Sequence, residues 1–123
     1  MIGKRYNIDS WNCTHEVAEW YELNGFGNIL KSVDRNKWDV HFVRWMRKRF
    51  IEIDKPEQSC LITMKHRVGG LHVGVWDCGM IHHCYEPNDK TIGQTIRSPL
   101  SHVKIEYKEI RYWRYTGEKN NLL

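Results

Sequence analysis

The sequence changes its hydrophobic period near the middle of the chain, after Asp54-Lys55-Pro56. Before this point apolar residues recur at the spacing of amphipathic helices, and after it they alternate with polar residues as in strands. Helices followed by neighbouring strands predict an α+β fold, with N-terminal helices packed on one face of a central antiparallel sheet. A length of 123 residues fits a single domain over 1–123, in which residues 116–123 form a polar, flexible tail.

Two helices are expected in the first half of the chain. The first runs from Cys13 to Leu23 and is followed by Asn24-Gly25, a common helix stop. Its acidic residues recur at every third position and are expected to face water: Glu16, Glu19 and Glu22. The second begins near Asp39 and ends in basic residues that are typical of a solvated helix end: Arg44, Arg47, Lys48 and Arg49.

The second half predicts strands joined by short turns. Turn residues occur at 68–70 and 77–79, where glycine allows the chain to reverse. The expected strands are 60–65, 71–76, 80–85 and one or two final strands over 103–107 and 110–115. This order is that of an antiparallel meander.

Cys13 stands on the first turn of the expected helix, directly after Asn12, which is a good N-cap. Unsatisfied backbone N–H groups and the positive end of the helix dipole favour a thiolate at that position, as a nucleophile requires. The alternative is that Cys13 is a small buried apolar residue, as most free cysteines are. A nucleophilic thiol also needs a base to take its proton and a third group to hold that base.

Among the seven histidines, His72 stands out because it lies in an apolar strand beside Gly74, which leaves room on the same face. A three-residue loop over 77–79 would pair Gly74 with His82, and we favour it because it puts a glycine where positive φ is needed. A two-residue loop would bring His83 to that face instead. The remaining histidines are expected on the surface: His15, His41, His66 and His102.

A zinc site is a second interpretation of this hairpin, which is dense in possible ligands: Cys78, His82, His83 and Cys84. Adjacent strand residues point to opposite faces, however, so His82 and His83 do not readily share one metal. A second Cys-x-x-Cys pair, which structural zinc sites usually have, is absent from the sequence. We therefore prefer the catalytic interpretation and expect no metal.

These motifs resemble those of the NlpC-type (NlpC/P-sixty) cell-wall cysteine peptidases, a papain-like family, and in particular its small phage-encoded members. Asn12-Cys13-Thr14-His15 is similar to the nucleophile motif, although the family usually has an acidic residue before the cysteine and small residues after it. The stretch 71–76, Leu-His-Val-Gly-Val-Trp, resembles the histidine motif, and Met80-Ile81-His82 the strand of the third polar residue. Residues 59–64 and 112–115 resemble the strand before the histidine and the final aromatic-basic strand.

The resemblance implies a papain-like NlpC-type fold in which Cys13 is the nucleophile, His72 the general base and His82 the residue that orients it. Tyr6 would line the oxyanion site. The implied activity is a peptidoglycan hydrolase, a cysteine endopeptidase that cuts stem peptides through an acyl-enzyme and needs no cofactor. Two alternatives remain: a CHAP-type wall amidase, which has the same residue order, and a non-catalytic phage tail or assembly module.

The net charge and hydropathy of the chain limit which partners and which cellular location are expected. A formal net charge of +4 is mild, and no nucleic-acid-binding motif accompanies it, so no nucleic-acid partner is expected. No run approaches the roughly 18 apolar residues of a membrane helix, and the first residues lack the apolar core of a signal peptide. We therefore expect synthesis in the cytoplasm with unpaired cysteines, and release by lysis or incorporation into a virion beside phage tail proteins.

Overall fold

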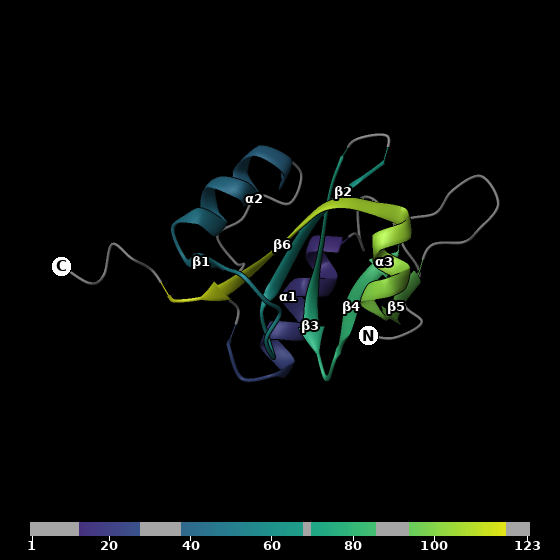
Figure 1. Cartoon of the computed structure of the whole chain (residues 1–123). Helices are drawn as coiled ribbons and strands as arrows, with labels where there is room; N and C mark the ends of the chain where they lie inside the picture. Colours follow the sequence, from purple (N-terminus) through teal and green to yellow (C-terminus); the bar gives the residue numbers. More distant parts are fainter. Residues whose placement is uncertain (1–12, 28–37, 68–69, 86–93, 118–123) are drawn as a thin grey trace.

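In the described part of the chain, six antiparallel strands form one sheet, to which three helices are added (Figure 1). The computed structural model describes residues 13–27, 38–67, 70–85 and 94–117, and for 13–15, 38–41, 84–85 and 94 it describes the backbone alone. In chain order the elements are α1 (Cys13–Leu23), α2 (Trp38–Arg47), β1 (Phe50–Ile53), β2 (Leu61–His66), β3 (Leu71–Asp77), β4 (Met80–Tyr85), β5 (Gln94–Ser98), α3 (Leu100–Glu106) and β6 (Tyr107–Tyr115). The α+β class is as the sequence predicted.

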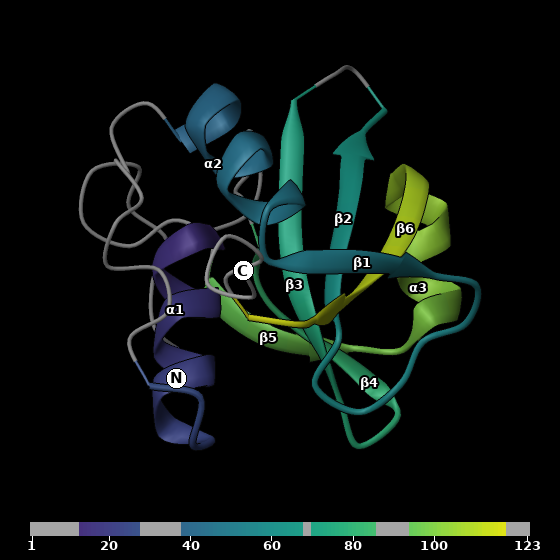
Figure 2. The same cartoon turned by 90° about the vertical axis from the view of Figure 1, so that its left-hand side faces the viewer.

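The strand order is β1-β6-β2-β3-β4-β5, so the C-terminal strand β6 is inserted between β1 and β2. Alternation along the strands gives the sheet two different faces. On the face that we call the α1 face, Val73 and Val75 pack with apolar residues of α1 and α2. On the face that we call the α3 face, Ile62 and Ile81 pack with Val103 of α3. Figure 2 shows α1 and α3 on opposite sides of the central strands.

The core of the α1 face is rich in aromatic side chains. Tyr21 of α1 and Phe50 of β1 are buried, with ring centroids 6.3 Å apart. The hydroxyl of Tyr21 donates to the backbone carbonyl of Ser59 at 2.9 Å, which ties α1 to the segment before β2. Because Tyr21 combines a large apolar ring with a satisfied hydroxyl, it fixes how the helix lies on the sheet.

The elements predicted with regular periodicity are confirmed. α1 has the predicted bounds, and β2, β3 and β4 lie within one residue of the predicted strands. The short strands β1 and β5 were not predicted. Residues 103–107 were predicted as a strand, which is wrong, since 103–106 complete α3 and only Tyr107 belongs to β6. The alternation in this segment does not reflect burial, because Val103 is buried whereas Ile105 is 67% exposed.

The arrangement of the helices also differs from the prediction. We expected the helices to precede the sheet and to cover one of its faces. Instead α3 lies between β5 and β6 in the chain and packs on the face opposite α1. Both faces of the central strands are therefore buried, which explains why β2 and β3 are apolar on both sides. Within the described ranges, no helix is both long and apolar enough to span a bilayer.

Candidate functional site

The hairpin between β3 and β4 has a two-residue loop, Cys78-Gly79. Val75 pairs with His82 and Asp77 with Met80, so the favoured three-residue loop was wrong and the alternative register is the observed one. Cys78 and Gly79 have φ angles of 51° and 81°, and two positive φ angles are what the tightest hairpin turns require. The backbone N–H of Cys78 donates to the side-chain oxygen of Gln58 at 2.8 Å, and this contact supports the turn from outside the hairpin.

This register brings His83, not His82, next to His72. His72 Nε2 and His83 Nδ1 are 2.9 Å apart, and both side chains are buried on the α3 face. Gly74 is closely packed at this point, since a Cβ on it would lie 3.0 Å from the Cβ of His83 and neighbouring atoms would have to move to admit it. The prediction that Gly74 leaves room for a second histidine is confirmed, but that histidine is His83 and the expected residue was His82.

The two histidines belong to a longer polar chain within the α3 face. His83 Nε2 lies 3.0 Å from the hydroxyl of Ser98, and the His72 ring stacks on Tyr107 at 4.8 Å with an interplanar angle of 7°. His66, expected on the surface, is half-buried and contacts the ring of Tyr107 at 4.9 Å. Burial lowers the pKa of His72 well below 6.5, and burial together with the charge of His82 lowers the pKa of His83 to about 4. Both rings are therefore neutral at pH 7.

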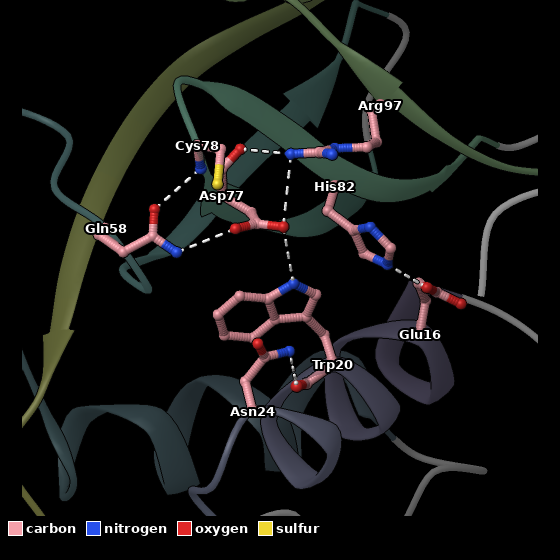
Figure 3. Close-up of polar contacts among 8 residues, drawn as sticks. All are labelled: Glu16, Trp20, Asn24, Gln58, Asp77, Cys78, His82 and Arg97. Atoms are coloured by element: carbon pink, nitrogen blue, oxygen red, sulfur yellow. Dashed lines mark hydrogen bonds and ion pairs between the residues drawn. The ribbon is translucent and has the colours of Figure 1, made fainter.

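His82 lies on the other side of the sheet, under α1, where its Nε2 contacts a carboxylate oxygen of Glu16 (Figure 3). The second oxygen of Glu16 accepts a hydrogen bond from the hydroxyl of Thr95 at 2.9 Å. Glu16 is 0% exposed, so the expectation that it faces water is wrong. Burial raises the pKa of Glu16, but hydrogen bonds from His82 and Thr95 oppose it and the net pKa is lowered. The carboxylate is thus held ionised inside the protein.

A second polar group anchors α1 one turn further along the helix. The indole N–H of Trp20 donates to Asp77 at 3.4 Å, and the amide of Gln58 donates to the same carboxylate at 2.9 Å (Figure 3). Arg97 completes the group with an ion pair of 3.4 Å to Asp77. These hydrogen bonds, led by the one from Gln58, lower the pKa of Asp77. α1 is consequently attached to the β3–β4 hairpin at two points, one turn apart on the helix.

The predicted catalytic residues are only partly brought together. Cys13 begins α1 as predicted, three residues before Glu16, and its side chain is outside the described set. Tyr6 lies outside the described residues. His82 is on the face that α1 covers, whereas His72 is on the opposite face. The structure therefore joins the first helix to His82 and separates both from His72.

Two residues of this site were not selected from the sequence. Glu16 was assigned to water because it fits the acidic stripe of α1, although its spacing of three from Cys13 was visible. Thr95 lies in β5, a strand that was not predicted, and its contact with Glu16 spans 79 positions in the chain. Nothing local in the sequence indicates such a contact.

The metal interpretation gains no support from the described residues. Among their histidine, cysteine, aspartate and glutamate side chains, no group of three could hold a metal ion. Cys78 is exposed at the hairpin turn and Cys60 is buried, and both are free thiols. Burial raises the pKa of Cys60, so this thiol is protonated at neutral pH.

Comparisons with protein-family models, with curated proteins and with solved structures found no match.

Proposed function

We propose that this protein is a peptidoglycan hydrolase, a cysteine endopeptidase that cuts stem peptides with Cys13 as nucleophile and His82 as general base. The observation that carries the proposal is the buried contact between His82 and Glu16. In this contact the carboxylate of Glu16 orients His82. Glu16 lies on the same helix as Cys13, three residues after it. A nucleophile, a base and a group that orients the base are the three parts that thiol catalysis needs.

The proposed chemistry follows from these positions. His82 takes the proton of Cys13, and the thiolate attacks the peptide carbonyl while backbone N–H groups at the start of α1 stabilise the oxyanion. The tetrahedral adduct collapses to a thioester as protonated His82 gives its proton to the leaving amine. Water, deprotonated by His82, then releases the acyl group and restores the thiol. Glu16 binds Nε2 of His82, so Nδ1 is the nitrogen that exchanges the proton, and the carboxylate stabilises the imidazolium.

The proposal changes the role of His72. The family resemblance assigns it as the base, with His82 orienting it. His72 is buried on the α3 face, where it bonds His83 and stacks on Tyr107, so in our proposal it supports the sheet behind the site. The papain-like NlpC-type fold remains part of the proposal and is supported by the order of the motifs along the chain.

The test is digestion of purified peptidoglycan, with fragments identified by mass spectrometry. Wild type should release new termini within the stem peptide, and Cys13→Ala should abolish them because no thiolate can form the acyl-enzyme. Cys78→Ala is the matched control, since it removes an exposed thiol at the hairpin turn. New termini at the junction of sugar and peptide would instead indicate an amidase of the CHAP type.

A non-catalytic tail or assembly module is the second candidate. It is favoured by one observation, the separation of His72 and His82 onto opposite faces of the sheet. This candidate predicts that wild type and Cys13→Ala leave peptidoglycan equally intact. Digestion by wild type that Cys13→Ala abolishes would exclude it.

A further inference from the structure

A groove of about 300 Å³ lies on the α1 face, between the end of α2 and strands β2 and β6. Its volume is at the lower end of the range of ligand pockets, which is about 300–1,000 Å³. The lining includes buried Trp113 and Met46, which are 7% and 2% exposed. The indole N–H of Trp113 donates to the hydroxyl of Thr63 at 2.9 Å, so these two polar groups are already paired. The base can therefore contact an apolar part of a ligand.

The rim of the groove is positively charged. Arg47, Lys65 and Arg111 line it, against Glu109 as the one carboxylate among its lining residues. Lys65 pairs with Glu109 at 3.3 Å, and both side chains are more than half exposed. Arg111 reaches Glu52 at 3.9 Å, also in an exposed setting. Exposed pairs of this kind contribute about 0–1 kcal/mol, so these cations can exchange partners for a ligand carboxylate at little cost.

The groove and the start of α1 belong to the same side of the molecule. Leu71, the first residue of β3, lines the groove, and two positions later Val73 packs in the cluster that contains α1 residues. In Figure 2 the N-terminal end of α1, drawn in the darkest purple, points toward α2 and the same end of β3. A peptide held in the groove could thus extend along the α1 face toward Cys13.

We infer that this groove binds a short carboxylate-bearing peptide, with Lys65 and Arg111 contacting its carboxylates and Trp113 its apolar part. Naming the acidic segment of the stem peptide as this ligand rests on the proposed function. The charge of the rim and the apolar base do not depend on it. The groove is therefore a site of substrate recognition on the same face as the proposed nucleophile.

The test measures binding without turnover, by titration calorimetry on the full chain carrying Cys13→Ala. The probes are the peptide L-alanyl-γ-D-glutamyl-L-lysine and its analogue in which the glutamate α-carboxylate is amidated. The acidic peptide should bind more tightly than the amidated one. Arg111→Gln and Lys65→Gln should each weaken binding of the acidic peptide about two- to fivefold and weaken binding of the analogue less, because the analogue keeps only its C-terminal carboxylate. Arg44→Gln is the control of equal charge change, because Arg44 is exposed on α2 outside the groove lining.

Equal affinity for the two peptides, or Arg111→Gln and Lys65→Gln variants that match Arg44→Gln, would overturn the inference. If the acidic peptide binds selectively but the chain that keeps Cys13 does not cleave it, the groove is supported as a binding site and the proposed hydrolase is rejected. Cleavage with an unchanged KM in Arg111→Gln and Lys65→Gln would reject the groove and leave the hydrolase standing. The two proposals can therefore fail separately.

Discussion

The two faces of the sheet bury histidine in opposite ways. On the α1 face, His82 contacts the carboxylate of Glu16, which also accepts from Thr95. On the α3 face, His72 contacts His83, and His83 also contacts the hydroxyl of Ser98. Strand β4 thus carries two adjacent histidines, His82 beside a carboxylate and His83 beside neutral groups.

The difference shows what each histidine can do. A buried carboxylate fixes the tautomer and orientation of the ring and stabilises the imidazolium that forms once the ring has taken a proton, which is what a catalytic base needs. On the α3 face no carboxylate contacts His72 or His83 among the hydrogen bonds described above, and burial lowers the pKa of both rings. The α1 face therefore places a carboxylate against its histidine, which the proposed function uses, whereas the α3 face keeps His72 and His83 neutral.

The largest expected effect is a difference in activity between variants of the histidines on the two faces. In peptidoglycan digestion, His82→Gln should lower the rate about 10²- to 10⁴-fold, because an amide can hydrogen-bond Glu16 but cannot transfer protons. His72→Gln should retain most of the rate, since His72 is on the face opposite α1. Glutamine is chosen in both cases to keep a hydrogen-bonding side chain. A large loss in His72→Gln with a well-folded protein would return the role of base to His72.

The next prediction concerns how the free energy of unfolding depends on pH. In the unfolded chain His83 takes a proton near pH 6.5, but in the folded protein its pKa is about 4. The unfolded state therefore binds more protons between these values, and the free energy of unfolding should fall by about 3 kcal/mol as the pH drops from 6.5 to 4. His72 acts in the same direction. Because the pKa of Glu16 is lowered below 4.5, its contribution is present above that pH and is lost only in more acidic solution.

Urea unfolding at pH 7, 5.5 and 4.5 measures this dependence. His83→Gln should flatten the decline above pH 4.5, because it removes a group that titrates only in the unfolded state there. His102→Gln is the control, since His102 is exposed on α3. Equal slopes for the two variants would mean that the α3 face does not hold His83 neutral.

The smallest effect compares two hydroxyls of β5 that lie on opposite faces. Thr95→Val removes a hydrogen bond to the Glu16 carboxylate, and Ser98→Ala removes one to neutral His83. Bonds to charged groups contribute about 1.5–3 kcal/mol and neutral ones about 0.5–1.5 kcal/mol, so Thr95→Val should be the more destabilising. Urea unfolding at pH 7 gives both free energies. The reverse order would contradict an ionised Glu16.

Much of the fold was predictable because its periodic segments are long. α1 and the strands β2, β3 and β4 carry regular apolar patterns, and these elements were placed within one residue. β1 has four residues, of which two are exposed, and it gives no pattern to detect. In α3, Val103 and Ile105 alternate with polar residues as in a strand, although only Val103 is buried and Ile105 is exposed. This alternation led to the wrong prediction.

The candidate site was predictable only in part. The sequence indicated Cys13 at a helix start and drew attention to His72, His82 and His83. Their distribution over the faces depended on a single residue of loop length in the β3–β4 hairpin. Cys78 adopts a positive φ, which is uncommon for a residue with a side chain, and its N–H is held by Gln58, 20 positions away.

By itself, then, the sequence determined the α+β class, the first helix with Cys13 at its start, and the central strands, because local periodicity and helix-end residues act over a few positions. Tertiary structure decided the second face with α3, the burial of Glu16 and the choice of His82 as its partner. Those features depend on contacts that span up to 79 positions, and a pattern read along the chain contains no information about them.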